Sequence, residues 1–208
     1  MFNDRRRRQP DHVRPTLLGN QLNTINAHAS ALVLIDYQAG LMPVILDGET
    51  AVANAQRLAK AARILDIPVL GTEQNPAKLG PNLAVIKAEC ESTLAKTHFD
   101  ACEDGLLQAL NSLKHECNEI VIAGCEAHVC MLQTAMGLLR AGKHVWVVAS
   151  ASGSRRNSDY RVAMDRLARA GATVVTHEMV MFEWLHDCRH PRFREVLALI
   201  KLADKSLA

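Results

Sequence analysis

Cys130, Asp36 and Lys96 are the residues of this 208-residue chain whose types and surroundings fit catalytic chemistry. Cys130 follows a buried strand pattern at 120–123 that turns at Gly124 and gives way to a helical pattern. A thiol at a helix start lies near unpaired backbone N–H groups and the positive end of the helix dipole, and both favour the nucleophilic thiolate. The same amides can hold an oxyanion. We therefore predict that Cys130 is a catalytic nucleophile.

Each of the three residues also has an interpretation without catalysis. Asp36 ends the apolar run 31–35, where a carboxylate needs a partner; it can act as a general base, or it can cap a loop or a helix. Lys96 lies in a polar stretch, and its distance along the sequence does not say whether it approaches Asp36. An unpaired cysteine can be an inert core residue. Taken singly, the three residues leave both interpretations open.

The elements that must position these residues alternate between buried strands and amphipathic helices. After an extended or flexible N-terminal arm, residues 1–30, one domain is predicted over 31–208. Short apolar runs predict strands at 31–35, 67–70, 120–123, 145–148 and 173–176, and helical spacing predicts helices over 49–65, 103–115, 126–142, 159–170, 178–185 and 193–202. A polar loop is expected at 72–76, and a short helix with an irregular crossover at 79–95.

This alternation is typical of an α/β protein, a three-layer α/β/α fold around a doubly wound, mostly parallel sheet. In such Rossmann-like sheets, ligands bind at the carboxyl ends of the strands. The rule gathers Asp36, the loop at Glu73 and Gln74, the turn before Cys130 and the loop 150–154 along one edge.

Several motifs occur in order along the chain: Leu34-Ile35-Asp36-Tyr37-Gln38, Lys96-Thr97-His98-Phe99, Gly124-Cys125-Glu126-Ala127-His128-Val129-Cys130 with Gln133-Thr134-Ala135, Ser154-Arg155, and His190-Pro191-Arg192-Phe193. With these motifs the chain resembles the isochorismatase-like cysteine hydrolases, a superfamily that includes nicotinamidases and N-carbamoyl-amino-acid amidohydrolases. Thr72-Glu73-Gln74-Asn75-Pro76 followed by Leu79-Gly80 is similar to the isochorismatase domain-containing branch. The resemblance covers nearly the whole chain from residue 31.

The resemblance implies a cysteine hydrolase in which Asp36 takes the proton of Cys130 and Lys96 orients and stabilises the charges. The thiolate would attack a small amide, carbamoyl or related C–N substrate and form a thioester that water hydrolyses. It also implies a cis peptide between Cys125 and Glu126 and an oxyanion hole made of the Glu126 and Cys130 backbone N–H groups. Candidate substrate-binding residues are Gln38, Glu73, Gln74, Phe99 and His128. We favour helix-capping or interface roles for the side chains of Glu126 and His128.

Departures from the family pattern narrow the chemistry. Where nicotinamidases carry an Asp-x-His metal motif, this chain reads Thr72-Glu73-Gln74-Asn75, so we expect no metal ion and no cofactor. True isochorismatases lack the cysteine, which argues against vinyl-ether hydrolysis. The sequence contains neither a Gly-x-Gly-x-x-Gly motif nor a P-loop, so it does not favour a nucleotide-binding protein. The alternative is a catalytically silent or thiol-sensing oligomer on the same fold.

The composition of the chain indicates its cellular compartment and its partners. The six cysteines have neither Cys-x-x-Cys nor zinc-site spacing, and no secretory signal or membrane-spanning run precedes them, so we predict reduced thiols in the cytoplasm. The net charge is +2, and the arginine run 5–8 is typical of a solvated tail. We expect a small-molecule substrate, a homo-oligomer of two or more copies, and neither nucleic acid nor membrane as a partner.

Overall fold

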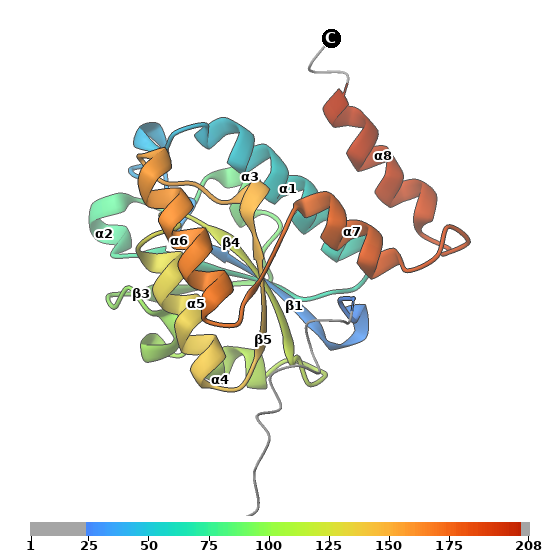
Figure 1. The fold of residues 1–208 in the computed structure, drawn as a ribbon, viewed down its shortest axis with the longest axis horizontal. Helices are drawn as coiled ribbons and strands as arrows, with labels where there is room; N and C mark the ends of the chain where they lie inside the picture. The colour runs from blue at the N-terminus through green and yellow to red at the C-terminus, as the bar shows by residue number, and fades with distance from the viewer. Residues whose placement is uncertain (1–23, 205–208) are drawn as a thin grey trace, which may run out of the picture.

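A six-stranded parallel sheet forms the middle layer of the protein in a computed structural model that describes residues 24–204 (Figure 1). The strand order, β3-β2-β1-β4-β5-β6, is the doubly wound order of Rossmann-like folds. The strands are β1 (Ser30–Ile35), β2 (Val69–Gln74), β3 (Ser92–Lys96), β4 (Glu119–Gly124), β5 (His144–Val148) and β6 (Thr173–Val175). Residues 1–23 of the predicted arm lie outside the described residues.

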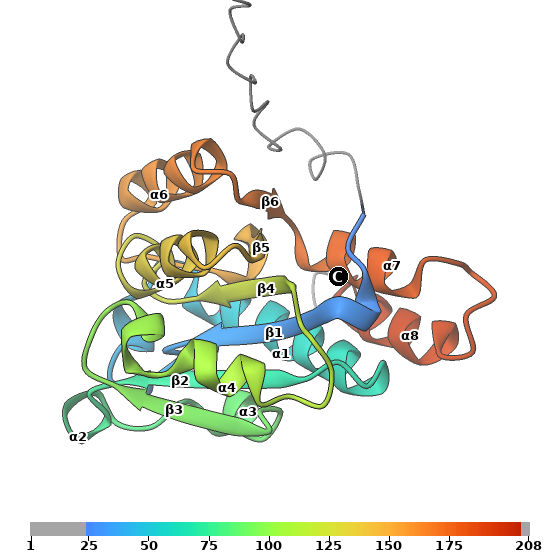
Figure 2. The ribbon, with the colours of Figure 1, turned by 90° about the horizontal axis from the view of Figure 1, so that it is seen from below.

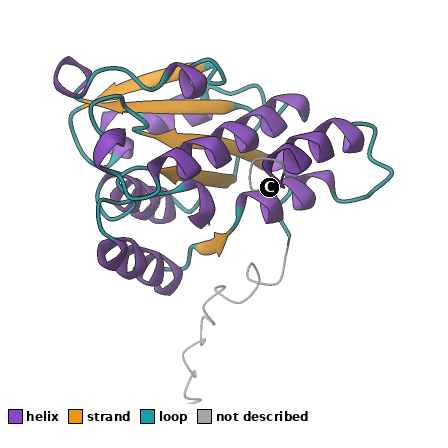
Figure 3. Cartoon of the chain, turned by 90° about the horizontal axis from the view of Figure 1, so that it is seen from above, coloured by secondary structure: helices purple, strands orange, loops and turns teal. Residues whose placement is uncertain are grey.

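Helices cover both faces of the sheet, which confirms the predicted three-layer α/β/α fold (Figure 2 and Figure 3). One face carries α1 (Gly48–Ile64), α3 (Ala84–Lys87), α7 (His177–Leu185) and α8 (Phe193–Asp204), and the other carries α4 (Leu106–Asn111), α5 (Cys130–Arg140) and α6 (Asn157–Arg169). Shorter elements are α2 (Pro76–Leu79) and the 3-10 helices η2 (Ala27–Ala29), η3 (Met42–Val44), η4 (Ala101–Asp104) and η5 (Ala149–Ala151). None of the described helices combines the length and apolar character that crossing a bilayer requires.

The central strand β1 is buried on both faces, and all of its residues after Ser30 are apolar. Leu32 and Leu34 pack into the core on the α1 face, whereas Val33 and Ile35 pack into the core on the α5 face. This division follows from the alternation of side chains along a strand. Full burial of each such side chain contributes about 1.5–3 kcal/mol.

Several boundaries differ from the sequence prediction. The helix expected over 103–115 is instead the 3-10 helix η4 followed by the shorter α4, because Gly105 takes a φ of +107° between them. Residues 72–74, expected in a polar loop, continue β2, because Thr72 pairs with Ile35 of β1 and Gln74 pairs with Lys96 of β3. The predicted crossover at 79–95 contains most of β3, an edge strand that is largely exposed and therefore shows no apolar run. Finally, α5 begins at Cys130, four residues after the predicted start.

Gly124 ends β4 at the point where β4 lies directly against β1. A Cβ atom at this position would lie 2.4 Å from both the Cβ and the carbonyl oxygen of Ile35. Only glycine permits this approach, because backbone atoms of a central strand cannot move aside. The close approach brings the loop after β4 next to Asp36, the residue that follows β1.

Gly124→Ala is therefore expected to lower the free energy of unfolding by about 3 kcal/mol or more, the upper part of the range for overpacking. Gly142→Ala is the matched control: nothing lies near the added methyl group, and only the φ of +77° opposes it, which costs about 1–2 kcal/mol. Denaturant unfolding of both variants measures the difference. Equal losses would contradict the close approach of β4 to β1.

Candidate active site

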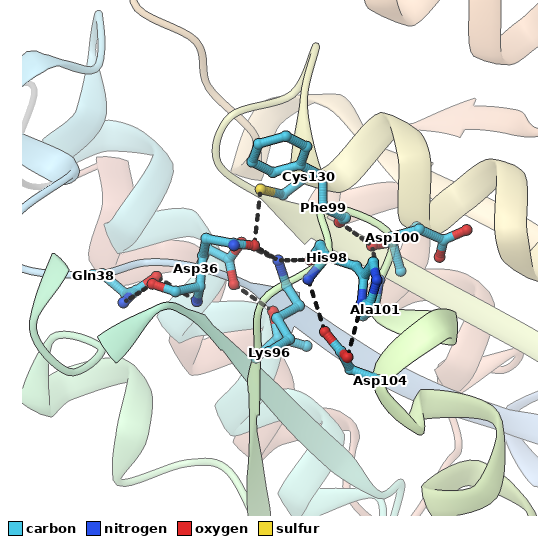
Figure 4. A network of polar contacts seen from close by, with 12 residues as sticks. Asp36, Gln38, Lys96, His98, Phe99, Asp100, Ala101, Asp104 and Cys130 are labelled. Carbon is cyan, nitrogen blue, oxygen red and sulfur yellow. Dashed lines mark hydrogen bonds and ion pairs between the residues drawn. The ribbon is translucent and has the colours of Figure 1, made fainter. Parts of the chain in front are cut away.

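Asp36 and Lys96 form an ion pair that is removed from solvent, with Lys96 Nζ 2.8 Å from Asp36 Oδ2 and both side chains 0% exposed (Figure 4). Asp36 has a φ of +54°, a left-handed conformation that aspartate tolerates better than most residues. Its Oδ1 accepts a hydrogen bond of 2.6 Å from the Thr72 hydroxyl. Its Oδ2 is the oxygen that pairs with Lys96, and the Cys130 thiol lies close enough to the Asp36 carboxylate for the thiol pKa to be raised by it.

Gln74 connects the lysine to the cysteine. Lys96 Nζ donates to Gln74 Oε1 at 2.6 Å and to the His98 carbonyl at 3.4 Å. The Cys130 sulfur lies 3.8 Å from the same Oε1, the distance of a weak thiol hydrogen bond. Gln74 Nε2 donates to the Thr97 carbonyl at 2.7 Å, which fixes the orientation of the carboxamide. The carboxyl ends of β1, β2 and β3 and the start of α5 therefore meet in one polar cluster.

Cys130 is the first residue of α5 and is 6% exposed. Burial raises the pKa of its thiol to about 12, and the Asp36 carboxylate adds to this increase, while Lys96 opposes it. The prediction that the helix start favours the thiolate is therefore wrong for the resting protein. A helix dipole contributes only about 0.3–1 kcal/mol, less than the desolvation of a buried anion. The resting group is a thiol beside a carboxylate that can accept its proton.

Two backbone N–H groups in the segment from β4 to the start of α5, those of Glu126 and Cys130, are the donors that the sequence prediction assigns to an oxyanion hole. The peptide bond between Cys125 and Glu126 is cis. Within the described residues, neither the Glu126 N–H nor the Cys130 N–H donates to a backbone carbonyl, whereas the neighbouring Ala127 N–H donates to Gly153 at 2.7 Å. A pair of unpaired N–H groups beside a nucleophile is the arrangement that stabilises tetrahedral intermediates.

The side chains of Glu126 and His128 do not cap α5, whose N-cap residue Val129 receives no side-chain hydrogen bond. Both side chains instead contact the loop after β5. Glu126 Oε2 accepts from Arg155 Nε at 2.8 Å, and His128 Nδ1 lies 3.0 Å from the Ser154 hydroxyl. The predicted capping role is therefore wrong, because these side chains bind a neighbouring loop.

The other candidate substrate-binding residues differ in burial and in hydrogen-bond partners. Gln38 is fully buried, and its carboxamide is used by the backbone of Gln74 and Gly80. Glu73 is also buried, and its Oε1 accepts from the backbone N–H of Asn82 at 2.9 Å. Phe99 is 50% exposed in the loop after β3. Of this set, Gln74 contacts both Lys96 and Cys130 directly.

The loop after β3 is held by two carboxylates. Asp104 Oδ2 accepts from the backbone N–H groups of Thr97 and His98, and its Oδ1 lies 2.9 Å from the His98 ring, a hydrogen bond that raises the histidine pKa. Asp100 accepts from Arg140 at 2.7 Å, and Gly137 on α5 leaves the space that this carboxylate fills. These bonds hold Lys96 and Phe99 at the site (Figure 4).

Sequence reasoning missed Thr72, Asp104 and Arg155 as supporting residues. Asp104 is a polar residue in a polar stretch, so no local pattern distinguishes it. Thr72 and Arg155 stood in recognised motifs, but nothing in the sequence paired Thr72 with Asp36 or Arg155 with Glu126, 29 residues earlier.

No group of three His, Cys, Asp or Glu side chains within residues 24–204 is arranged to hold a metal ion. A cavity of about 220 Å³ borders Lys96 on the side of Thr97 and Asp104. A larger cavity, about 960 Å³, lies at the opposite, amino end of the sheet beside Trp184. We place the candidate site by its reactive groups rather than by cavity size.

The fold and this cluster define a class: doubly wound α/β proteins with a buried acid, lysine and cysteine at the topological switch point between β1 and β4. The isochorismatase-domain family model matches residues 30–179. The chain belongs to the isochorismatase family.

Related proteins support this assignment over most of the chain. Isochorismatase domain-containing protein 2 of Danio rerio is 34% identical over 179 residues, which are 86% of this chain and 90% of that protein. The protein of the same name from Homo sapiens is 36% identical over 173 residues, 83% of each chain.

Solved structures show the same fold. The MAR1 ribonuclease of Caenorhabditis elegans has a TM-score of 0.80 at 34% identity, covering 86% of this chain and 92% of that one. The Escherichia coli YcaC product, described as an octameric hydrolase of unknown specificity, has a TM-score of 0.75 at 23% identity, covering 88% and 97%. At this lower identity the likeness to YcaC concerns the fold alone.

The charges around Cys130 predict an unusual response to mutation. Asp36→Asn removes a negative charge that raises the thiol pKa, so alkylation of Cys130 by iodoacetamide at about pH 8 is expected to become roughly tenfold faster, corresponding to about one pKa unit. Site-resolved mass spectrometry measures the rate. The exposed Cys188 is the internal control, and a melting curve verifies folding. An unchanged or slower reaction at Cys130 would contradict the proximity of Asp36 to the thiol.

Proposed function

We propose that this protein is a cysteine-dependent hydrolase of a small amide, carbamoyl or related C–N substrate. The observation that carries the proposal is the convergence of Asp36, Lys96 and Cys130 from three distant segments in one buried cluster. Family membership supports hydrolase chemistry on this fold. The catalytic residues are Asp36, Lys96 and Cys130, with the backbone of Glu126 and Cys130 as the oxyanion hole.

In the first half-reaction, Asp36 accepts the thiol proton as the sulfur attacks the substrate carbonyl carbon. Transfer to a neighbouring carboxylate suits a thiol whose pKa is raised by burial, because the thiolate is needed only during attack. The tetrahedral oxyanion is held by the Glu126 and Cys130 N–H groups. The C–N bond then breaks, and Asp36 returns the proton to the leaving nitrogen, so that an amine or ammonia departs and a thioester remains.

In the second half-reaction, Asp36 takes a proton from water, and the resulting hydroxide attacks the thioester carbon. The same two amides hold the second oxyanion. When the C–S bond breaks, the sulfur regains a proton, and the carboxylic or carbamic acid leaves. Lys96 remains charged throughout, bonded to Asp36 and Gln74, and stabilises each negative charge that forms beside it.

The burial of the site favours a small substrate. Cys130 is 6% exposed and Lys96 is 2% exposed, so only a compact group reaches the sulfur. RNA is the second candidate substrate, because the Caenorhabditis elegans relative at 34% identity is described as a ribonuclease. The near-closure of the cluster favours small molecules over a polymer.

We also propose that the protein assembles into a homo-oligomer, in line with the octamer described for the YcaC product. The cytoplasmic location, the absence of a cofactor and the single domain over 31–208 remain predictions from the sequence. Sedimentation at micromolar concentration is expected to give a mass of at least two chains; a monomer at that concentration would contradict the assembly.

The catalytic proposal is tested by screening primary amides, ureas and carbamates for ammonia release, with structured and single-stranded RNA in a parallel arm. Cys130→Ala is expected to lower kcat on the accepted substrate on the order of a thousandfold or more, because the covalent route is lost. Asp36→Asn is expected to lower turnover as well, even though it makes the sulfur more reactive towards iodoacetamide.

Cys188→Ala is the matched control, since this thiol is exposed and lies between α7 and α8. It should retain the activity of the unaltered chain. Full hydrolysis by Cys130→Ala would refute the mechanism, and RNA cleavage that survives in Cys130→Ala while no C–N substrate is hydrolysed would replace the proposed substrate class. Reversible inactivation by peroxide without any turnover would favour the thiol-sensing alternative.

A further inference from the structure

The carboxylate of Glu126 is almost entirely buried beside the candidate oxyanion hole. Its side chain is 9% exposed, and Oε2 accepts hydrogen bonds from both Nε and the backbone N–H of Arg155, at 2.8 Å and 3.2 Å. The arginine side chain is itself 58% exposed. A charged residue at the surface thus reaches inward to a buried anion.

This ion pair belongs to a wider attachment between two loops. The loop after β5 binds the loop after β4 through its backbone: Ala127 N–H donates to the Gly153 carbonyl at 2.7 Å, and Gly153 N–H donates to the Gly124 carbonyl at 3.2 Å. Ser154 and His128 add a side-chain contact of 3.0 Å. The segment that carries the Glu126 N–H is therefore held from outside by residues 153–155.

The sign of the charge on Glu126 matters for catalysis. The backbone N–H of this residue is a candidate donor to a negatively charged oxygen, yet its own side chain is an anion in the same buried region. An uncompensated carboxylate there would oppose the charge that develops in the transition state, and low dielectric would strengthen the repulsion. Arg155 supplies the compensating positive charge.

We propose that Arg155 is a positioning residue, which neutralises the Glu126 carboxylate and aligns the Glu126 N–H for the oxyanion. The proposal rests on the proposed hydrolase function and goes beyond it by assigning a role to a residue outside the acid–lysine–cysteine cluster. Arg155 touches no reacting atom in this role. It acts through Glu126, and its charge and its backbone N–H contribute separately.

Three other titratable groups lie near this ion pair. His128 lies on the same loop as Glu126 and contacts Ser154. Cys125 is buried, and the Glu126 carboxylate is one of the groups that raise the pKa of its thiol. The Asp159 carboxylate on α6 raises the pKa of Arg155. Arg155 is the partner that contacts the Glu126 carboxylate through hydrogen bonds. Replacing Arg155 therefore leaves a buried carboxylate without its compensating cation, which is unfavourable in a region of low dielectric constant.

The test uses three variants and one control in the full-length chain, assayed on the C–N substrate that the screen identifies. Arg155→Met removes the charge but keeps the backbone N–H. Glu126→Gln combined with Arg155→Met removes both charges, and the new carboxamide oxygen can still accept the N–H of residue 155. Arg155→Lys keeps the charge without the planar fork. Arg156→Met, at the exposed neighbouring arginine, is the matched control.

We expect Arg155→Met to lower kcat about thirtyfold at about pH 8.5 with KM changed less than about threefold, because one oxyanion donor is impaired while ground-state binding is not. The double variant, which carries neither charge, should recover most of kcat. Arg155→Lys should recover kcat in part, and Arg156→Met should match the unaltered chain.

Three results would overturn the inference. A wild-type kcat in Arg155→Met would remove any role for the ion pair. A loss that is not recovered in the double variant would indicate a merely structural contact. A large rise in KM with unchanged kcat would instead make Arg155 a substrate-binding residue. Failure of the proposed function is distinguished because it appears in the unaltered chain, as absent turnover or as turnover that survives Cys130→Ala, and it overturns both proposals.

Discussion

The site depends on one constraint: two opposite charges, on Asp36 and Lys96, are buried together and must satisfy each other. Removing one partner of such a pair costs about 3–5 kcal/mol, because the other is left as a buried, uncompensated charge. The remaining bonding capacity is taken up by Thr72, Gln74 and the His98 carbonyl. These bonds fix the relative positions of the carboxyl ends of β1, β2 and β3, and the Cys130 sulfur lies against this set of bonded residues.

The doubly wound topology makes this convergence possible. In a parallel sheet all carboxyl ends lie at one edge, and ligands bind where the chain reverses its winding direction. Here that point lies between β1 and β4, so the residue after β1 and the turn after β4 are neighbours although 88 positions separate Asp36 from Gly124. Gly124 brings the two strands close enough because it has no side chain.

Charged groups control the protonation of Cys130 and the charge around Glu126. Burial and a nearby carboxylate keep Cys130 protonated at rest, and the same carboxylate is the base that would activate it. A resting thiol is protected from oxidation, since the thiolate is the reactive form. In the segment between β4 and α5, the Glu126 carboxylate is paired with Arg155. Both ion pairs, Asp36 with Lys96 and Glu126 with Arg155, join segments that are distant in the sequence.

The sequence alone determined the fold class, and it singled out three residues, Asp36, Lys96 and Cys130, that the fold brings together. The apolar runs of the central strands, such as 31–35 and 120–123, are buried on both faces, and helical spacing located α1 and α6 to within a few residues. The ordered motifs around Asp36, Lys96 and Cys130 indicated the family that the comparisons then showed. These features are local, because hydrophobic periodicity and motif spacing are properties of neighbouring residues.

Only the tertiary structure decided how these residues act on one another. The edge strand β3 carries too few buried residues to form a pattern, so the register that sets Gln74 opposite Lys96 could not be read from the sequence. The pairing of Arg155 with Glu126 likewise joins loops from different parts of the chain. The ionisation of Cys130 was predicted with the wrong sign, because local position reveals the helix start but not the burial. Desolvation and charge proximity are set by the packing of distant segments, which is why the chemical state of the site required the fold.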